Sequence, residues 1–332
     1  MNVTVMSDGA WGTAIALTLL DNQHRVTMWG PFPDYLEQMQ RDRENSRFLK
    51  GVSLPAELRF CADVGEAICE ADFVVMAAPT QYVRGAANLL AAAALDPETP
   101  IVNVAKGIEL GTLKRVSEII ADELGDNPYA VLAGPSHAEE VAHRIPTAVV
   151  AAASDPALAS RIQEAFLTPN FRVYTSDDPI GVELGGALKN VYAIAAGICD
   201  GMKLGDNPKA ALITRGIAEM ARLGGALGGR PETFAGLSGV GDMIVTCTSG
   251  HSRNRHVGEE LGRGKTLDTI TAEMGMVVAE GVKTAQSAHE LARETGVETP
   301  IIDNVYAALY EDKDPQTVVR DLMERDAKGE LE

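Results

Sequence analysis

The order of secondary-structure signals along this chain constrains its fold more than any other feature. Short β-rich runs alternate with helical stretches up to about residue 175, and the strand signals then stop. Strands that alternate with helices form βαβ units, so we predict an α/β fold with a doubly wound, mainly parallel sheet followed by an all-helical part. The predicted strands are Val3–Met6, Val26–Trp29, Phe73–Ala78, Ile101–Val104, Tyr129–Ala133, Ala148–Ala152 and Phe171–Tyr174, and the predicted helices between them are Trp11–Leu20, Gln81–Ala94, Leu113–Glu123 and Ala157–Phe166.

The length of the chain supports two domains. With 332 residues it exceeds the size at which one hydrophobic core usually suffices. The change from mixed to purely helical patterning falls at Asp177-Asp178-Pro179. We therefore predict one domain over residues 1–178 and a second, all-helical domain over residues 179–332.

Charge and cysteine usage exclude several classes of partner. A formal net charge of −18 argues against binding to nucleic acid or to an anionic membrane. No signal peptide and no membrane-spanning run is recognisable. The cysteines form no CxxC pair and no metal-like spacing, so we expect no metal site and reduced cysteines in a cytoplasmic protein. They are Cys61, Cys69, Cys199 and Cys247.

A glycine-rich turn follows the first predicted strand and precedes a helix. Its sequence, Ser7-Asp8-Gly9-Ala10-Trp11-Gly12, has the place and spacing of the G-x-G-x-x-G turn of Rossmann-like domains. In that turn, backbone N–H groups at the helix start bind a pyrophosphate. Ser7 replaces the first glycine, which implies either a φ that serine tolerates or an altered loop. An ordinary βα turn is the alternative. The candidate cofactor contacts are Gly9, Ala10, Trp11 and Gly12.

The end of the second strand usually separates NAD from NADP. An acidic side chain there binds the ribose hydroxyls, whereas an arginine binds a 2′-phosphate. Here the chain reads Trp29-Gly30-Pro31-Phe32-Pro33 and carries neither, and Asp34 comes a few residues late. The sequence therefore leaves the cofactor as NAD or NADP.

Lys189 stands out in the first helical stretch of the second part, residues 180–197, which is almost free of charge. Its neighbours on a helix face are small and apolar, so another body can approach the amine. Burial lowers the pKa of a lysine towards neutrality, where the amine becomes a general base or acid. A lysine that reaches water from a core helix is the alternative. The neighbouring positions are Val182, Gly185, Gly186, Ala193, Ala196 and Gly197.

Two loops that leave predicted strands carry further candidates. Lys106 follows Ile101–Val104, and a cation at the carboxyl end of a strand suits an anionic or carbonyl-bearing substrate. After the strand that ends at Ala133, Ser136 and Glu139 have the spacing of a capping box at the start of a helix. We expect this helix start also to contact the ligand. A solvated loop lysine and a purely structural cap are the alternatives.

Asp242 and Thr246 follow a glycine-rich segment and share a helix face. A carboxylate near Lys189 would orient the amine and raise its pKa, against the effect of burial. The residue types alone do not say which effect is larger. A cap residue after a glycine-rich turn is the alternative for Asp242.

The segment from His251 to His256 contains four cationic or potentially cationic side chains. We expect Ser252 to cap a helix and to leave the N–H groups of Arg253 and Asn254 free. A free helix N-terminus beside an arginine is suited to phosphate. A solvated basic patch is the alternative.

These motifs resemble those of bacterial NAD(P)-dependent glycerol-3-phosphate dehydrogenase, in the same order and over essentially the whole chain. The Leu-Lys-Asn motif at Lys189 and the Ser-Arg-Asn motif at Ser252 are specific to that group. Two departures are Ser7 for the usual first glycine and Pro31 for an arginine or histidine beside the adenosine ribose, while His137 for a common phenylalanine is a neutral variation. The matching segments are Ser7–Gly12, Ala105–Gly107, Gly134–Ser136, Glu183–Asn190, Gly239–Asp242, Ser252–Asn254 and Val278–Gly281.

The resemblance implies a role for each candidate residue. Lys189 looks like the catalytic lysine that exchanges a proton with the C2 hydroxyl, with Asn190, Asp242 and Thr246 beside it. The other positions that match substrate contacts are Lys106, Gly134, Ser136, Ser252, Arg253 and Asn254. The positions that match nucleotide contacts are Trp11, Pro31, Lys106, Ala138, Arg253, Val278 and Glu280.

The activity that the resemblance implies is reversible reduction of dihydroxyacetone phosphate to sn-glycerol 3-phosphate, which supplies phospholipid synthesis. A β-hydroxyacid dehydrogenase is one alternative, because it shares the domain order and a lysine–asparagine pair. A non-catalytic dinucleotide sensor is another, suggested by the altered glycine motif. The expected partner is a small molecule, and a homodimer is compatible with a sequence that does not fix the oligomeric state.

Overall fold

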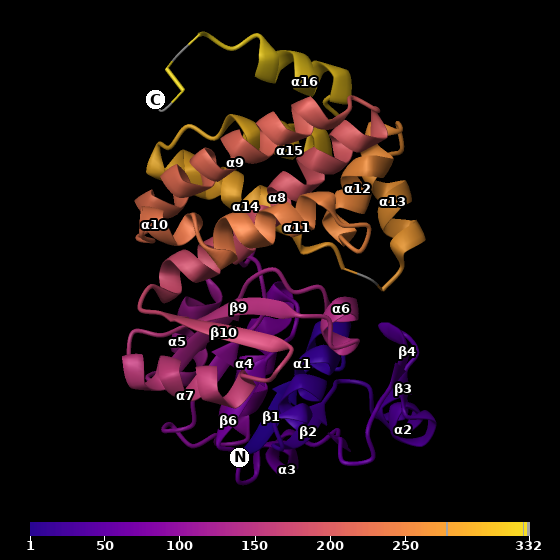
Figure 1. Ribbon diagram of the computed structural model, residues 1–332, viewed down its shortest axis with the longest axis vertical. Coiled ribbons are helices and arrows are strands. Elements are labelled where there is room, and N and C mark those ends of the chain that lie inside the picture. Colours follow the sequence, from indigo (N-terminus) through magenta and orange to yellow (C-terminus); the bar gives the residue numbers. More distant parts are fainter. Residues whose placement is uncertain (277, 328, 331–332) are drawn as a thin grey trace.

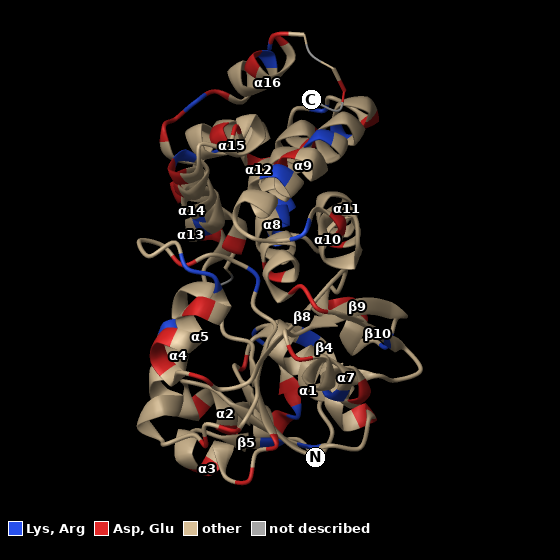
Figure 2. Cartoon of the chain, turned by 90° about the vertical axis from the view of Figure 1, so that its left-hand side faces the viewer, with Lys and Arg blue, Asp and Glu red and all other residues tan. Residues whose placement is uncertain are grey.

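The computed structural model describes residues 1–276, 278–327 and 329–330. A sheet with its helices forms one part of the molecule, and a group of helices is stacked on one end of it (Figures 1 and 2). The eight-stranded sheet has the order β10-β9-β8-β7-β6-β1-β2-β5, and every neighbouring pair is parallel except β8 and β9. Its strands are β1 Asn2–Met6, β2 Arg25–Trp29, β5 Arg59–Cys61, β6 Phe73–Met76, β7 Ile101–Asn103, β8 Tyr129–Ala133, β9 Thr147–Ala152 and β10 Phe171–Ser176. The predicted doubly wound, mainly parallel sheet is thus confirmed.

Both faces of the sheet are covered, which explains why its central strands are apolar at nearly every position. Successive side chains of a strand point to opposite faces. In β6, Phe73 and Val75 belong to the core under α1 and α7, while Val74 and Met76 belong to the core under α3, α4 and α5. The helices of this part are α1 Ala10–Asp21, α2 Pro33–Asp42, α3 Val64–Ile68, α4 Thr80–Ala92, α5 Val116–Leu124, α6 Ala138–Ala142 and α7 Pro156–Phe166.

The second part is built around α8, Pro179–Gly201, which is buried over most of its length. A helix that is apolar on all sides needs neighbours on all sides, and α8 contacts α9, α11, α12, α14 and α15. No strand occurs after Ser176 in the described residues. The remaining elements are α9 Asp206–Ala226, α10 Pro231–Phe234, the π-helical turn η1 Leu237–Gly241, α11 Asp242–Thr248, α12 Arg253–Gly262, α13 Leu267–Met274, α14 Glu280–Thr295, α15 Pro300–Tyr310 and α16 Pro315–Met323.

The region between β2 and β6 contains elements that the sequence did not predict. A short antiparallel pair, β3 Glu44–Asn45 and β4 Leu49–Ser53, lies beside α1 and α6 (Figure 1). Among the described helices, none is both long and apolar enough to cross a membrane.

Candidate active site

A cleft opens where the carboxyl ends of the central strands meet the helical part. In a doubly wound sheet this edge, near the point where strand order reverses, is where ligands bind. Here β1 lies between β2 and β6, so the chain leaves β1 towards one side of the sheet and returns to the other. The predicted residues that line the cleft are Gly9, Ala10, Trp11, Lys106, Ser136, Ala138, Lys189, Asn190, Thr246, Ser252, Arg253, Asn254, Val278 and Glu280.

Lys189 lies at the floor of this cleft and is almost fully buried, with 6% of its surface exposed. Its Nζ donates to Asp242 Oδ1 at 2.9 Å and to Thr246 Oγ1 at 2.7 Å. Asp242 is the first residue of α11, which continues η1 without a break, and its carboxylate makes no helix cap. The structure therefore brings together the lysine and carboxylate that the sequence placed 53 residues apart.

A second lysine approaches the same carboxylate from the sheet. Lys106 Nζ donates to Asp242 Oδ2 at 2.7 Å and to the carbonyl oxygen of Gly134 at 3.0 Å. Ser136 Oγ lies 3.5 Å from the Lys106 amine and donates to the same carbonyl at 2.8 Å. The predicted capping box is wrong, because Ser136 turns to Gly134 and α6 begins after His137 without a side-chain cap.

Burial and charge act against each other on this cluster. Burial lowers the pKa of Lys189 to about 8, and the attraction of Asp242 only partly offsets it while Lys106 adds to it. For Asp242, burial raises the pKa, but the two lysines outweigh it and the pKa is lowered overall. The carboxylate thus stays ionised at neutral pH, while the Lys189 amine can gain or lose its proton near the pH of a cell.

An amide chain fixes the position next to Lys189. Asn190 Nδ2 donates to the carbonyl of Lys106 at 3.2 Å, and Asn254 Nδ2 donates to Asn190 Oδ1 at 2.8 Å. Asn254 Oδ1 then accepts from the N–H of Gly281 at 2.9 Å. These bonds join the loop after β7 to α8, α12 and the first turn of α14, so they hold both walls of the cleft in register.

The basic segment divides into one arginine that faces the cleft and one that does not. Ser252 caps α12 as predicted, since its Oγ accepts from Arg255 N at 3.2 Å. Arg253 lines the cleft and donates to the carbonyl of Val278 at 3.3 Å. Arg255 is paired instead with Asp200 at 2.6 Å and is not among the described residues that line the cleft.

The small residues of α8 serve mainly to bring helices together. A Cβ on Gly197 would lie 2.0 Å from the carbonyl oxygen of Arg255, and one on Gly185 would lie 2.8 Å from that of Ser238. The bodies that approach these two glycines are therefore α12 and η1, where the sequence predicted only that another body could come close. Gly186 differs, because its open side faces the aliphatic stem of Lys106.

The dinucleotide turn keeps a glycine-like backbone in spite of its serine. Ser7 has a φ of +155°, and its Oγ accepts the N–H of Gly9 at 3.1 Å. A Cβ on Gly12 would lie 2.7 Å from the Ser7 carbonyl oxygen, so this glycine allows α1 to pack against the strand end. Across the cleft, Glu280 accepts from Thr80 N at 2.9 Å, and burial raises the pKa of its carboxyl.

Some predicted residues lie outside the cleft lining, and some lining residues were not predicted. Gly12, Gly134 and Asp242 lie behind the surface, and Pro31 is exposed beyond the end of β2. The segment 77–79 follows β6, whose adjacency to β1 is not visible in the sequence. His137 and His251 face each other with ring centroids 5.9 Å apart, so position 137 belongs to the cleft. The unpredicted lining residues are Ser7, Ala77, Ala78, Pro79, Val104, Ala105, His137, Glu139 and His251.

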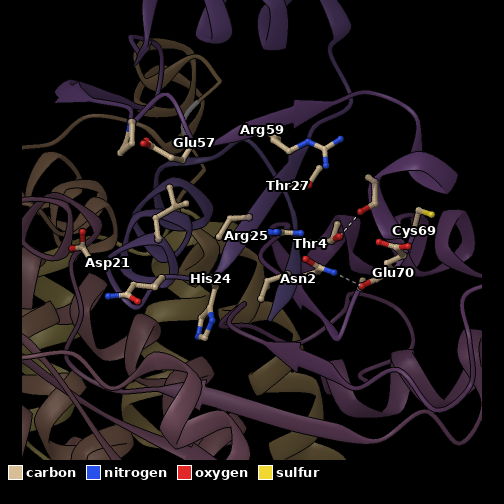
Figure 3. A pocket seen from close by; sticks show the side chains of 17 residues that line it. Asn2, Thr4, Asp21, His24, Arg25, Thr27, Glu57, Arg59, Cys69 and Glu70 are labelled. Carbon is tan, nitrogen blue, oxygen red and sulfur yellow. Dashed lines mark hydrogen bonds between the residues drawn. The ribbon is translucent and has the colours of Figure 1, made fainter.

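A second hollow lies at the opposite edge of the sheet. Figure 3 shows Asn2, Arg25 and Arg59, which begin β1, β2 and β5, around this hollow. Its charges are mixed, and Asn2 Nδ2 is already bonded to the carbonyl of Glu70 at 3.1 Å. Because ligands of open α/β sheets bind at the carboxyl ends of the strands, we assign the function to the cleft at Lys189.

Two family models together match most of the chain. The model described as NAD-dependent glycerol-3-phosphate dehydrogenase N-terminus matches residues 2–159, and the corresponding C-terminus model matches residues 178–320.

Curated proteins and solved structures agree with these matches. The chain is 50% identical to a glycerol-3-phosphate dehydrogenase [NAD(P)+] of Prosthecochloris aestuarii, with 100% of both chains covered. It is 51% identical to one of Geobacillus kaustophilus, with 100% of this chain and 96% of the other covered. The crystal structure of glycerol-3-phosphate dehydrogenase from Coxiella burnetii superposes with a TM-score of 0.93 at 38% identity, with 98% of this chain and 99% of the other covered.

Proposed function

The chain belongs to the NAD-dependent glycerol-3-phosphate dehydrogenase family, and on that premise we propose that its cleft interconverts dihydroxyacetone phosphate and sn-glycerol 3-phosphate. The enzyme is an NAD(P)-dependent oxidoreductase. The observation that carries the assignment of roles is the buried Lys189 amine, bonded to Asp242 and Thr246 at the floor of the cleft.

Lys189 is the group that exchanges a proton with the substrate oxygen at C2. In the direction of reduction the ammonium donates to the oxygen as it becomes a hydroxyl, and in the direction of oxidation the neutral amine accepts that proton. Asp242 and Thr246 aim the amine, and Lys106, held by the other oxygen of Asp242, stabilises negative charge near the carbonyl.

Arg253 and the start of α12 hold the phosphate of the substrate. The first N–H groups of a helix have no acceptor within it, and an arginine beside them adds two directed donors. Ser252 Oγ binds the N–H of Arg255, which leaves the N–H groups of Arg253 and Asn254, two residues that line the cleft, to donate to the phosphate. Asn254 and Asn190 tie this end of α12 to Lys106 and so keep phosphate and carbonyl contacts at a fixed separation.

The residues at the start of α1 fit a nicotinamide dinucleotide. The turn from Ser7 to Gly12 has the tight backbone that pyrophosphate needs, and the indole N–H of Trp11 is buried without a partner in the described residues. When bound, the cofactor supplies or accepts the hydride. Gly9, Ala10 and Trp11 would hold it on the sheet side, and Ala138, Arg253, Val278 and Glu280 on the opposite side of the cleft.

The division of labour between two domains is also part of the proposal. Residues 1–178 would bind the dinucleotide, and residues 179–332 would supply Lys189 and the phosphate grip. The end of β10 at Ser176 and the start of α8 at Pro179 support this boundary. Four free cysteines support a reducing, cytoplasmic setting. A homodimer and a role in phospholipid synthesis complete the proposal by analogy with the family.

A spectrophotometric assay tests the activity. The loss of absorbance of NADH, and separately of NADPH, is followed after addition of dihydroxyacetone phosphate. We expect oxidation with at least one of them, and we expect Lys189→Ala to lose about two to four orders of magnitude in kcat. Lys283→Ala is the matched control, because Lys283 is exposed on α14 and outside the cleft lining. A Lys189→Ala enzyme within a few fold of the parent would overturn the role of this lysine.

The same assay separates the alternatives. Oxidation of the cofactor with a β-hydroxyacid's keto form, but not with dihydroxyacetone phosphate, would identify a hydroxyacid dehydrogenase. Cofactor binding without oxidation on any substrate would identify a sensor.

A further inference from the structure

The glycine turn contains a buried carboxylate that the proposed mechanism does not use. Asp8 stands between Ser7 and Gly9, which both line the cleft, and only 5% of its surface is exposed. Its Oδ2 is buried and has no hydrogen-bond partner among the described residues. An unpaired carboxylate oxygen is costly in a folded protein, so it calls for a ligand or another explanation.

The side chain of Asp8 lies against the end of β2, where an acid is missing from the sequence. Strands β1 and β2 are parallel with Met6 opposite Trp29, and Ser7 N donates to the carbonyl of Trp29 at 3.0 Å. A Cβ on Gly30 would lie 2.9 Å from Asp8 Oδ2. Glycine at position 30 therefore leaves room for a carboxylate that comes from the neighbouring loop instead of from β2 itself.

The surrounding residues hold in place the backbone of the loop that carries this carboxylate. Asn45 Nδ2 donates to the Asp8 carbonyl at 2.8 Å and to Thr13 Oγ1 at 2.7 Å. Tyr35 donates to Asn45 Oδ1 at 2.7 Å, so β3 and α2 both brace the loop. The Asp8 position is thus built into the fold and does not depend on a flexible surface side chain.

One cation lies near enough to act on Asp8 but does not pair with it. The guanidinium of Arg47 lies 3.9 Å from the centre of the Tyr35 ring, and its charge only partly opposes the effect of burial, which raises the pKa of Asp8. Among the described residues Arg47 forms no ion pair with Asp8 and acts on it only through its charge. The unpartnered Oδ2 of Asp8 therefore lies just beneath the cleft surface that Ser7 and Gly9 form, and it still lacks a hydrogen-bond donor in the described part of the chain.

We propose that Asp8 replaces the missing acid of β2, accepts a hydrogen bond from the adenosine ribose, and makes the enzyme prefer NAD(H) to NADP(H). This inference rests on the proposed function, since it concerns the cofactor of the same cleft. A ribose hydroxyl satisfies the unpaired oxygen, whereas a 2′-phosphate brings negative charge against a carboxylate. The acid that binds the ribose and selects NAD(H) thus lies in the loop after β1 instead of at the end of β2. Gly30 makes room for it there.

The test compares cofactor binding and turnover in matched variants of the full chain. Dissociation constants for NADH and NADPH are measured by calorimetry without substrate, for the parent, Asp8→Ala and Asp8→Asn. Asp8→Asn keeps the volume of the side chain and serves if Asp8→Ala does not fold. Asp34→Asn is the control, because Asp34 is the acid that follows β2 along the chain and is exposed on α2.

We expect the parent to bind NADH more tightly than NADPH by about tenfold or more, since a hydrogen bond to a charged group is worth at least that much. Both Asp8 variants should lose most of this preference, and Asp34→Asn should keep it within about twofold. A parent that prefers NADPH, or Asp8 variants that fold and keep the parent's ratio, would overturn the proposal. Absence of dihydroxyacetone phosphate reduction with either cofactor would instead count against the proposed function.

Discussion

Lys189 and Asp242 form a buried ion pair, with Nζ 2.9 Å from Oδ1, while Lys106 holds the other oxygen of the same carboxylate at 2.7 Å. One carboxylate therefore serves two cations. Burial destabilises the ammonium form of Lys189, and the single negative charge of Asp242, which Lys106 also uses, offsets this only in part. This arrangement leaves the pKa of Lys189 at about 8, low enough for the amine to work in both directions of a reversible reaction.

The first prediction concerns pH. Reduction needs the ammonium form of Lys189, so its rate should fall as the pH rises through about 8, and oxidation, which needs the neutral amine, should rise over the same range. The measurement is kcat/KM in both directions between about pH 6 and pH 10, with the cofactor at saturation. A reduction profile that stays flat up to about pH 10 would show that the lysine is not the titrating group.

The second prediction concerns a variant, Asp242→Asn, that lacks the carboxylate shared by the two lysines. Asp242 raises the pKa of Lys189, and Lys106 lowers it, so Asp242→Asn takes away attraction and leaves repulsion. The descending limb of the reduction profile should move to lower pH by about one unit or more. Thr246→Val is the matched control, because it removes a hydrogen bond to the same amine without changing a charge. A limb that moves equally in both variants would mean that hydrogen bonding, and not charge, sets the pKa.

The third prediction contrasts two arginines on the first turn of α12. Arg253→Ala should raise KM for dihydroxyacetone phosphate by about ten- to a hundredfold, because a charged hydrogen bond to phosphate is lost. Arg255→Ala should leave KM nearly unchanged and lower thermal stability, because Arg255 pairs with Asp200. Steady-state kinetics and thermal unfolding of both variants check this, and a larger rise in KM for Arg255→Ala would contradict it.

The sheet could be predicted because its information is local. Each central strand is a short β-branched run between helix signals, and each of the seven predicted strands is found within a few residues of its expected bounds. The pair β3–β4 and the edge strand β5 were not predicted, because these strands are short and contain charged residues such as Lys50 and Arg59. A partly exposed strand tolerates such residues.

The candidate site could be predicted as a set of residues but not as a geometry. The motifs named Lys189, Asp242, Lys106 and Arg253, and all four lie in or directly behind the cleft. Lys106 and Asp242 are 136 residues apart in the chain, and their contact depends on how the helical part is stacked on the sheet. No local sequence pattern encodes that stacking.

Some details of the site have local physical reasons that a sequence pattern does not show. Arg253 and Arg255 are two positions apart on a helix, and such positions point to different sides, so Arg253 lines the cleft while Arg255 pairs with Asp200. Ser136 donates to the carbonyl of Gly134 and lies beside the Lys106 amine, so its hydroxyl does not form the helix cap that its spacing suggested. Glycines on α8 indicated close approach correctly, but they did not say whether a ligand or another helix would come.

The last prediction separates packing glycines from dispensable ones. A Cβ on Gly197 would lie 2.0 Å from the carbonyl oxygen of Arg255, so Gly197→Ala must force α8 and α12 apart. We expect a loss of about 3 kcal/mol in the free energy of unfolding, the upper end for overpacked cores. Gly225→Ala is the control within α9, where a Cβ would meet nothing within 4 Å. The free energy of unfolding of Gly225→Ala should rise by about 0.5–1 kcal/mol, because alanine favours the helix and lowers the conformational entropy of the unfolded chain.

Denaturant unfolding of Gly197→Ala and Gly225→Ala gives the comparison. Because Asn254 lies in α12 and bonds to Asn190 in α8, Gly197→Ala should also weaken turnover, whereas equal stability of the two variants would show that α8 and α12 are not in the close contact described.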